Sequence, residues 1–376
     1  MYQRPAAFAL NEAFVVLLSS YLKNYGSRFL LIVPNNVSVS GPVSVYVESL
    51  GGSIITVSEI NRIEKNNWPS HIWVHSFGGV PTAKSLIYHF GVGYSLYSDG
   101  LKNQLGKKGM EEYFPDYESV LFFGFMWVFP FLRKGVLFEI CPFQDIILAF
   151  AAIKSIAGVE LSFHSEDLKK DWVFLRRWGY GRGEFVRHLK YKDVIKRYLS
   201  EEGASALVLK GDPRIRTTST DDVLTSLRDE FDVVSIEDRV EFTKYNSIVS
   251  DKYFAEVMLP GQICGNFHAF DSSLSVYASL VTNANIRFPS EEFLRKIFDD
   301  PGFARGVILY TSLYRNVCNY IKKLRDAQSF NVRSALVVEG REGGFVVSED
   351  NSILSMSSDN RRGGKTVYEA GAVGAL

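Results

Sequence analysis

The sequence predicts an α/β protein made of two halves, each a parallel sheet with helices wound on both of its faces. Strand-like apolar runs alternate with helix-like segments along both halves of the chain, and glycine-rich turns follow several of these runs. The 376 residues also exceed what one hydrophobic core usually organises, so two domains are expected. Hydrophobic residues make up 46% of the chain, which is typical of a globular protein.

The first half shows this alternation most regularly. The segment 11–25 carries apolar residues at helical spacing, and Gly26 supplies its stop. Strands are expected at residues 7–10, 29–33 (FLLIV), 53–57, 71–75 (HIWVH) and 94–97, and helices at 11–25, 42–50 and 81–90. Right-handed crossovers bring the loops after parallel strands to one edge of the sheet. The turns that follow 71–75 and 94–97 are therefore expected at the same edge.

The middle of the chain is less regular. The apolar run 120–132 contains Pro130 and is shorter than the ~20 residues that span a bilayer. We expect it to be core or, as the alternative, a surface that touches lipid, and no transmembrane segment is expected. A helix is expected at 144–157, and the charged, glycine-punctuated stretch 164–192 suits a connection between domains or a surface excursion.

The α/β rhythm resumes in the second half. Strands are expected at 206–209 and 231–235, and helices at 221–230, 274–281 and within 301–327. The composition of the tail from Arg341 onward predicts weak structure. These patterns predict an N-terminal domain at 1–165, a C-terminal domain at 166–330 and an extension at 331–376 that is partly of low order.

Composition and the absence of common motifs exclude several function classes. Lys and Arg together number 42, as do Asp and Glu, so no basic surface for nucleic acid is expected. The three cysteines form no CxxC pair, which argues against a disulfide framework or a zinc site. No HExxH, Walker A or GxSxG pattern occurs. Residues 1–20 lack a secretory pattern, so we expect a cytoplasmic protein, with the run 120–132 as a possible peripheral contact with the inner face of the membrane.

Three short motifs stand where predicted strands end or predicted helices begin. They are Ser98-Asp99-Gly100, Lys210-Gly211-Asp212-Pro213 and Ser272-Ser273. Taken singly, Asp-Gly and Gly-Asp-Pro are turn sequences, and a serine pair before an apolar run is a helix cap. Their order and spacing together indicate ligand-facing loops.

In that order the motifs resemble the series of the bacterial GT-B sialyltransferases, which include the lipooligosaccharide sialyltransferases and the capsule polysialyltransferases. Those enzymes carry an acidic pair with a glycine, then a Lys-x-His-Pro element, then a serine pair. The resemblance covers about residues 5–290. It implies the GT-B glycosyltransferase architecture, in which two Rossmann-like domains bind substrates in the cleft between them.

The resemblance also implies roles for individual residues. Asp99 would be the general base that deprotonates the acceptor hydroxyl, a role that suits a carboxylate at a rigid strand end. Ser272 and Ser273, at a helix start with unpaired amides, would hold the departing CMP phosphate, and Lys210 would add positive charge. The full donor-side set is Lys210, Gly211, Pro213, Gln262, Ser272 and Ser273, and the acceptor-side set is His75, Ser76, Gly78 and Gly100.

The chain departs from the family pattern at three places. Ser98 replaces the first acidic residue, Asp212 replaces the histidine of the His-Pro pair, and Pro260-Gly261-Gln262 stands where the family often has Pro-x-Glu. An ionised Asp212 would repel a departing phosphate. Three explanations stay open: Asp212 is held protonated, His268 takes over as the proton donor, or the protein is not a conventional member.

The expected function is therefore an inverting transfer of a sialic acid or related nonulosonic acid from a CMP-activated donor to a glycan hydroxyl. The expected acceptor is a bacterial surface polysaccharide such as capsule or lipooligosaccharide. The scheme requires no cofactor and no metal; its partners are the nucleotide-sugar donor and the glycan acceptor. Two alternatives stay open: a GT-B transferase that uses CMP-Kdo or a UDP- or GDP-sugar, and a non-catalytic glycan- or nucleotide-binding relative.

Overall fold

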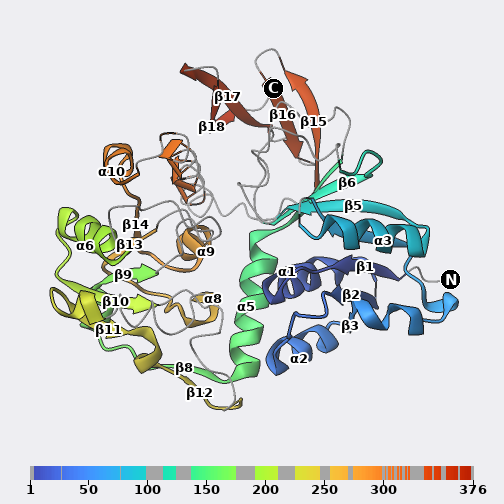
Figure 1. Cartoon of the computed structure of the whole chain (residues 1–376), viewed down its shortest axis with the longest axis horizontal. Helices are drawn as coiled ribbons and strands as arrows, with labels where there is room; N and C mark the ends of the chain where they lie inside the picture. The colour runs from blue at the N-terminus through green and yellow to red at the C-terminus, as the bar shows by residue number, and fades with distance from the viewer. Residues whose placement is uncertain are drawn as a thin grey trace. The chain divides into compact units, whose positions relative to one another are not determined.

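The computed structural model describes residues 4–26, 28–76, 78–98, 113–123, 137–174, 191–210, 225–245, 255–269 and 274–298, together with parts of 301–321 and the strands between 334 and 373. The chain forms two units. The first comprises Met1–Ile156 and Ala327–Leu376, and the second comprises Ala157–Asp326. Figure 1 labels the elements of each unit along the chain.

The first unit is built on parallel strands in the order β7-β6-β5-β4-β1-β2-β3. Its elements up to residue 157 are β1 (Pro5–Phe8), α1 (Glu12–Leu22), β2 (Phe29–Val33), α2 (Gly41–Ser49), β3 (Gly52–Thr56), η1 (Val57–Arg62), η2 (Lys65–Asn67), β4 (His71–His75), α3 (Val80–Phe90), β5 (Gly93–Ser98), β6 (Ser119–Phe123), β7 (Leu137–Cys141) and α5 (Phe143–Ala157). The strand order reverses between β1 and β4. In open parallel sheets, the crevice outside the carboxyl ends of two such strands is where ligands bind.

Helices cover both faces of this sheet, as the sequence predicts for a parallel sheet. The FLLIV strand β2 is buried along its whole length, which is the burial expected when both faces are covered. Leu86 and Phe90 of α3 share a core with Ile72 and Val74 of β4. On the opposite face the ring of Phe14, from α1, lies 5.1 Å from the ring of Tyr97 in β5.

Two helix ends in this unit follow from local sequence. Asn11 caps α1, because its side-chain oxygen accepts a hydrogen bond of 3.0 Å from the amide of Phe14. Helix α3 begins after Gly79 and ends at Gly91, and both glycines have positive φ, at 63° and 61°. Glycine adopts that backbone conformation without the strain that a side chain would cause.

The second unit is a five-stranded parallel sheet in the order β11-β10-β9-β13-β14, with a separate antiparallel pair of β8 and β12. Its elements are β8 (Val159–Leu161), η4 (Asp167–Lys169), β9 (Asp171–Phe174), α6 (Tyr191–Glu201), β10 (Ala206–Lys210), β11 (Asp232–Ser235), η5 (Ile236–Arg239), β12 (Val240–Phe242), α8 (Ala255–Met258), β13 (Asn266–His268), α9 (Leu274–Val281), β14 (Asn285–Arg287) and α10 (Glu291–Ile297). Here the strand order reverses between β9 and β13.

The two faces of the second sheet carry different cores. Val173 of β9 and Leu209 of β10 pack with Tyr198 of α6 and Leu294 of α10. The next residues along these strands point to the opposite face, because side chains alternate along a strand. Phe174 lies on that second face, where its ring stacks on Phe267 at 5.2 Å.

The predicted α/β class with two parallel sheets is confirmed, but one predicted connector is partly wrong. Residues 164–192 were expected to link domains, whereas β9 within them is the central strand of the second sheet. Its four residues, DWVF, lie among charged neighbours that hide the strand signal. Trp172 and Val173 are fully buried between β10 and β13, and that burial outweighs the polar flanks.

The structure of the C-terminal segment also differs from the one that its composition predicts. Three antiparallel strands occupy residues from Arg341 onward, where weak structure was expected: β16 (Gly343–Ser348), β17 (Ile353–Arg362) and β18 (Lys365–Val373). They follow β15 (Ser334–Gly340), which pairs antiparallel with β16. Strand β15 pairs antiparallel with β7, with Ser334 opposite Glu139. Runs such as ALVV and FVV have high strand propensity, and the Gly340–Gly343 pair closes the first hairpin.

The apolar run 120–132 falls only in part within the described residues. Its first residues belong to β6, which is almost entirely buried, and residues 124–132 lie outside the described part of the chain. Within the described residues, no helix combines the length and the apolar character needed to cross a membrane.

Candidate functional site

The predicted acceptor-side residues His75, Ser76 and Gly78 lie at the switch point of the first sheet. Strand β4 ends at His75, and the turn into α3 packs against the loop that follows β1. A Cβ atom added at Gly78 would collide with the side chain of Leu10, so this close approach requires glycine. The sheet edge that the sequence predicts for this loop is the observed one.

His75 holds this turn together from inside the fold. Its Nδ1 accepts a hydrogen bond of 2.6 Å from the amide of Gly78, and its ring packs edge-on against Tyr97 at 5.1 Å. The side chain is buried, with 3% of the residue exposed. A direct contact of His75 with an acceptor therefore stays a prediction, while its support of the turn is observed.

Strand β5 brings the first motif to the same edge. Ser98 is its last residue, and the neighbouring β4 ends at His75, which pairs with Tyr97. The amide of Ser76 donates to the carbonyl of Tyr97 at 3.0 Å, so the two strand ends are tied to each other. Asp99 and Gly100 lie outside the described residues, and the role of Asp99 stays a prediction.

The second sheet places two predicted donor-side residues at its own carboxyl edge. Lys210 is the last residue of β10 and His268 is the last residue of β13. Strand register puts their side chains on opposite faces, because Lys210 pairs with Phe174 and His268 pairs with Val173. Gly211, Asp212, Pro213, Ser272 and Ser273 lie outside the described residues; in the sequence, the serine pair falls between β13 and α9.

Lys210 is a buried charge with a counter-ion that the sequence analysis missed. Only 1% of the residue is exposed, and its Nζ lies 3.4 Å from Oε1 of Glu237 in η5. The other carboxylate oxygen of Glu237 accepts a hydrogen bond from the hydroxyl of Ser235, the last residue of β11. A signal was present in the sequence, since Ser235 ends a predicted strand and Glu237 follows two residues later.

His268 lies in the core of the second unit. Its Nδ1 is 3.1 Å from the hydroxyl of Tyr198, its Nε2 is 3.3 Å from Oδ2 of Asp171, and 1% of the residue is exposed. Burial raises the pKa of Asp171, but hydrogen bonds from His268 and Asn266 outweigh it and hold that pKa below its ordinary value. A proton donor must reach the leaving group with one ring nitrogen. In His268 one nitrogen faces Tyr198 and the other faces Asp171, so the observed ring orientation does not point to this role.

Gln262 is not brought to the carboxyl edge. It precedes β13, and the amide of the next residue, Ile263, donates to Asn283, which precedes β14. Both residues therefore lie at the amino edge of the sheet. The residues before Pro260 form helix α8, so the turn at 260–262 leads from a helix towards β13 and does not follow a strand.

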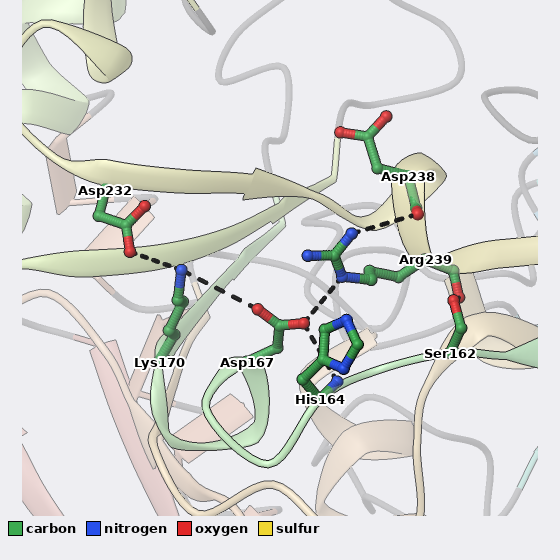
Figure 2. Close-up of polar contacts among 7 residues, drawn as sticks. All are labelled: Ser162, His164, Asp167, Lys170, Asp232, Asp238 and Arg239. Carbon is green, nitrogen blue, oxygen red and sulfur yellow. Dashed lines mark hydrogen bonds and ion pairs between the residues drawn. The ribbon is translucent and has the colours of Figure 1, made fainter.

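A charged network fixes η5, the element that carries Glu237 (Figure 2). Nε of Arg239 lies 2.8 Å from Oδ2 of Asp167, and the same carboxylate accepts from the amide of His164 at 3.2 Å. Lys170 lies between Asp167, at 3.9 Å, and Asp232, at 2.6 Å. Asp167 is 3% exposed, so it is the buried centre of the network.

We expect Asp167→Asn to lower the free energy of unfolding by about 2 kcal/mol, because it removes a buried carboxylate from Arg239 and Lys170. Burial raises the pKa of Asp167, but Arg239, the amide of His164 and Lys170 outweigh it and lower that pKa. The stabilisation is therefore present above the unfolded-state pKa and is lost as the pH falls through the folded-state value. Urea unfolding at pH 7 and pH 3 measures both effects.

The matched control is Asp232→Asn, at the exposed end of the same network, where 69% of the side chain is accessible. An exposed ion pair contributes about 0.5 kcal/mol or less, so this variant should remain close to the wild type. Equal losses for the two variants would contradict the central position of Asp167.

The first unit contains a second polar feature that sequence patterns did not indicate. One polar residue on each of four adjacent strands takes part in a chain of contacts: Nε2 of His71 lies 2.9 Å from Ser95 Oγ, Ser95 Oγ lies 2.7 Å from Ser119 Oγ, and Ser119 donates to Glu139. Tyr25, in the turn after α1, donates to the other oxygen of Glu139. Burial raises the pKa of Glu139 to about 7.

Within the described residues, no group of three or more His, Cys, Asp or Glu side chains is arranged to hold a metal ion.

Neither protein-family models nor curated proteins give a match to the chain. Among solved structures it is similar to HepE of Anabaena in complex with UDP-glucose, with 8% identity, a TM-score of 0.40, and coverage of 86% of this chain and 98% of HepE. It is also similar to MurG of Acinetobacter baumannii, with 9% identity, a TM-score of 0.38, and coverage of 86% and 99%. Because likeness at this level carries no functional argument, the site is interpreted from its own residues.

Proposed function

We propose that this protein is a glycosyltransferase that moves a sialic acid or a related nonulosonic acid from a CMP-activated donor to a glycan hydroxyl. One observation carries the proposal. Ser98 ends β5 and Lys210 ends β10, and residues 272–273 fall between β13 and α9. Two motifs of the sialyltransferase-like series thus begin at carboxyl ends of described parallel strands, where α/β sheets bind ligands, and the third follows β13 in the sequence.

The chemistry assigns the two units different tasks. In the first, Asp99 follows a strand end that is tied to β4, and a carboxylate fixed in this way can take the proton of an attacking hydroxyl. An anion there also stabilises the positive charge that develops on the sugar in an oxocarbenium-like transition state. One displacement by the activated hydroxyl inverts the anomeric centre.

The second unit provides for the leaving phosphate. Ser272 and Ser273 precede α9, whose first amides have no intrahelical partner, and such amides bind phosphate oxygens well. Lys210 supplies a positive charge from β10. The proton donor to the phosphate remains a choice between Asp212 and His268, and the buried, doubly contacted ring of His268 favours a role in supporting β13.

Nucleotide binding tests this proposal directly. Calorimetric titration with CMP, UDP, GDP and AMP should show selective binding of CMP, and Ser272→Ala/Ser273→Ala should weaken that binding by at least about tenfold, the loss of one to two charge-assisted hydrogen bonds. Ser275→Ala serves as the control, because Ser275 is a fully buried serine of α9.

Each other outcome changes the proposal in a defined way. Selective binding of UDP or GDP would keep a nucleotide-sugar transferase and discard the CMP donor. Binding of none of the four nucleotides would favour a non-catalytic glycan-binding protein.

A further inference from the structure

The contact between Lys210 and Glu237 is longer than two more exposed lysine–carboxylate pairs of its unit. The exposed pairs Lys170–Asp232 and Lys196–Glu230 have N–O distances of 2.6 and 2.7 Å, the usual length of a charge-assisted hydrogen bond. Lys210 is far more buried, yet its distance to Glu237 is 3.4 Å. A buried ammonium has more need of a close partner than an exposed one, because water does not solvate it.

Lys210 also has hydrogen-bonding capacity to spare. An ammonium group carries three N–H donors. Within the described residues, the structure pairs its Nζ with Glu237 alone. At the carboxyl edge of the sheet, the ammonium therefore has donors available for an anionic ligand.

Glu237 is held independently of Lys210. Ser235 donates to one carboxylate oxygen, and η5 is anchored by Arg239, whose carbonyl accepts from the amide of Ser162 at 2.8 Å and whose guanidinium pairs with Asp167. About a quarter of the Glu237 side chain is exposed, compared with almost none of Lys210. The carboxylate thus stands on the solvent side of the buried ammonium.

We propose that Glu237 is a resident counter-ion that occupies the place of a ligand phosphate at Lys210. When a phosphate or diphosphate group binds, it becomes the partner of the ammonium, and Glu237 stays with Ser235. The carboxylate keeps the buried charge paired in the free protein and makes phosphate binding weaker than Lys210 alone would allow. This inference deepens the proposed function, since it describes how the donor phosphate would meet the second sheet.

Inorganic pyrophosphate is the probe, titrated by calorimetry into the full chain at constant ionic strength. Glu237→Gln should bind pyrophosphate about tenfold more tightly than the wild type, because the repulsion between carboxylate and phosphate is removed. Ser235→Ala should shift affinity in the same direction by a smaller factor. Lys210→Met should abolish binding, and so should Lys210→Met combined with Glu237→Gln, a double variant that leaves no buried charge unpaired.

Glu230→Gln is the matched control, because it opens an exposed lysine–glutamate pair of ordinary length in the same unit. Its pyrophosphate affinity should equal that of the wild type. Weaker or unchanged binding by Glu237→Gln would overturn the proposal, and so would undiminished binding by the double variant. Because the probe contains neither nucleoside nor sugar, this result is independent of whether CMP is the preferred nucleotide.

Discussion

Raising the pH from 5 to 8 is expected to remove about 3 kcal/mol of stability through Glu139, because one unit of pKa shift corresponds to about 1.4 kcal/mol. Burial raises the pKa of this carboxyl to about 7, above the ordinary value of 4.5. The folded state therefore holds the proton more tightly than the unfolded state. The stability that this proton contributes is complete below the unfolded-state pKa of Glu139 and is lost as the pH rises through 7. Urea unfolding of the wild type and Glu139→Gln across this range measures it.

The reference variant is needed because a second group in the same chain acts in the opposite sense. Burial lowers the pKa of His71, against the charge of Glu118, which raises it. His71 therefore lowers the free energy of unfolding as the pH falls below the pKa that the histidine has in the unfolded state. Subtracting the curve of Glu139→Gln, which retains His71, isolates the contribution of the carboxyl group.

Glu48→Gln provides the matched control, because Glu48 is an exposed carboxylate of α2 in the same unit. It should retain the pH dependence of the wild type. An unchanged slope in Glu139→Gln between pH 5 and 8 would show that Glu139 is not protonated in the folded protein at the lower pH.

Sequence patterns predicted the strands that are continuous and apolar. FLLIV and HIWVH were assigned at their observed bounds as β2 and β4, and Leu274–Val281 was assigned as helix α9. The strand β9 was missed, because only the four residues DWVF separate two charged segments. What identifies β9 as a strand is its pairing with β10 on one side and β13 on the other, which the short sequence alone does not reveal.

Side-chain direction explains why the candidate site was only partly predictable. The sequence predicts a strand that ends just before Lys210, but the opposite faces on which Lys210 and His268 lie follow from a pairing register that no local pattern contains. The partners of these side chains are equally distant along the chain. Lys210 meets Glu237, and His268 meets Asp171 and Tyr198.

Buried polar residues were the hardest to interpret for the same reason. Ser95, Ser119 and Glu139 each interrupt an apolar strand and read as solvent-facing positions when taken alone. Strand register brings them onto one face in adjacent strands, where each satisfies the next. A buried hydrogen-bonded network of this kind is visible only once the sheet is assembled.

The substitution Asp99→Asn is expected to have the largest effect on activity. If Asp99 is the general base, the amide cannot accept the hydroxyl proton, and kcat should fall about 10²- to 10⁴-fold. CMP affinity should be unchanged, because the nucleotide is proposed to bind the other unit. Transfer from CMP-sialic acid and from CMP-Kdo, measured as CMP release, gives kcat, and calorimetry gives the affinity.

Ser98→Ala is the matched control for Asp99. Ser98 ends β5 beside the turn that His75 holds, so a disturbance of the strand end alone would appear in this variant as well. A general base also leaves a signature that structural damage does not. The acidic limb of the pH profile of kcat/KM, which reports the ionisation of Asp99, should disappear in Asp99→Asn while any residual rate persists at low pH. If Asp99→Asn keeps the full turnover of the wild type, the carboxylate of Asp99 has no part in the mechanism. Lys210 and the serine pair of the second unit would then be a nucleotide-binding site only.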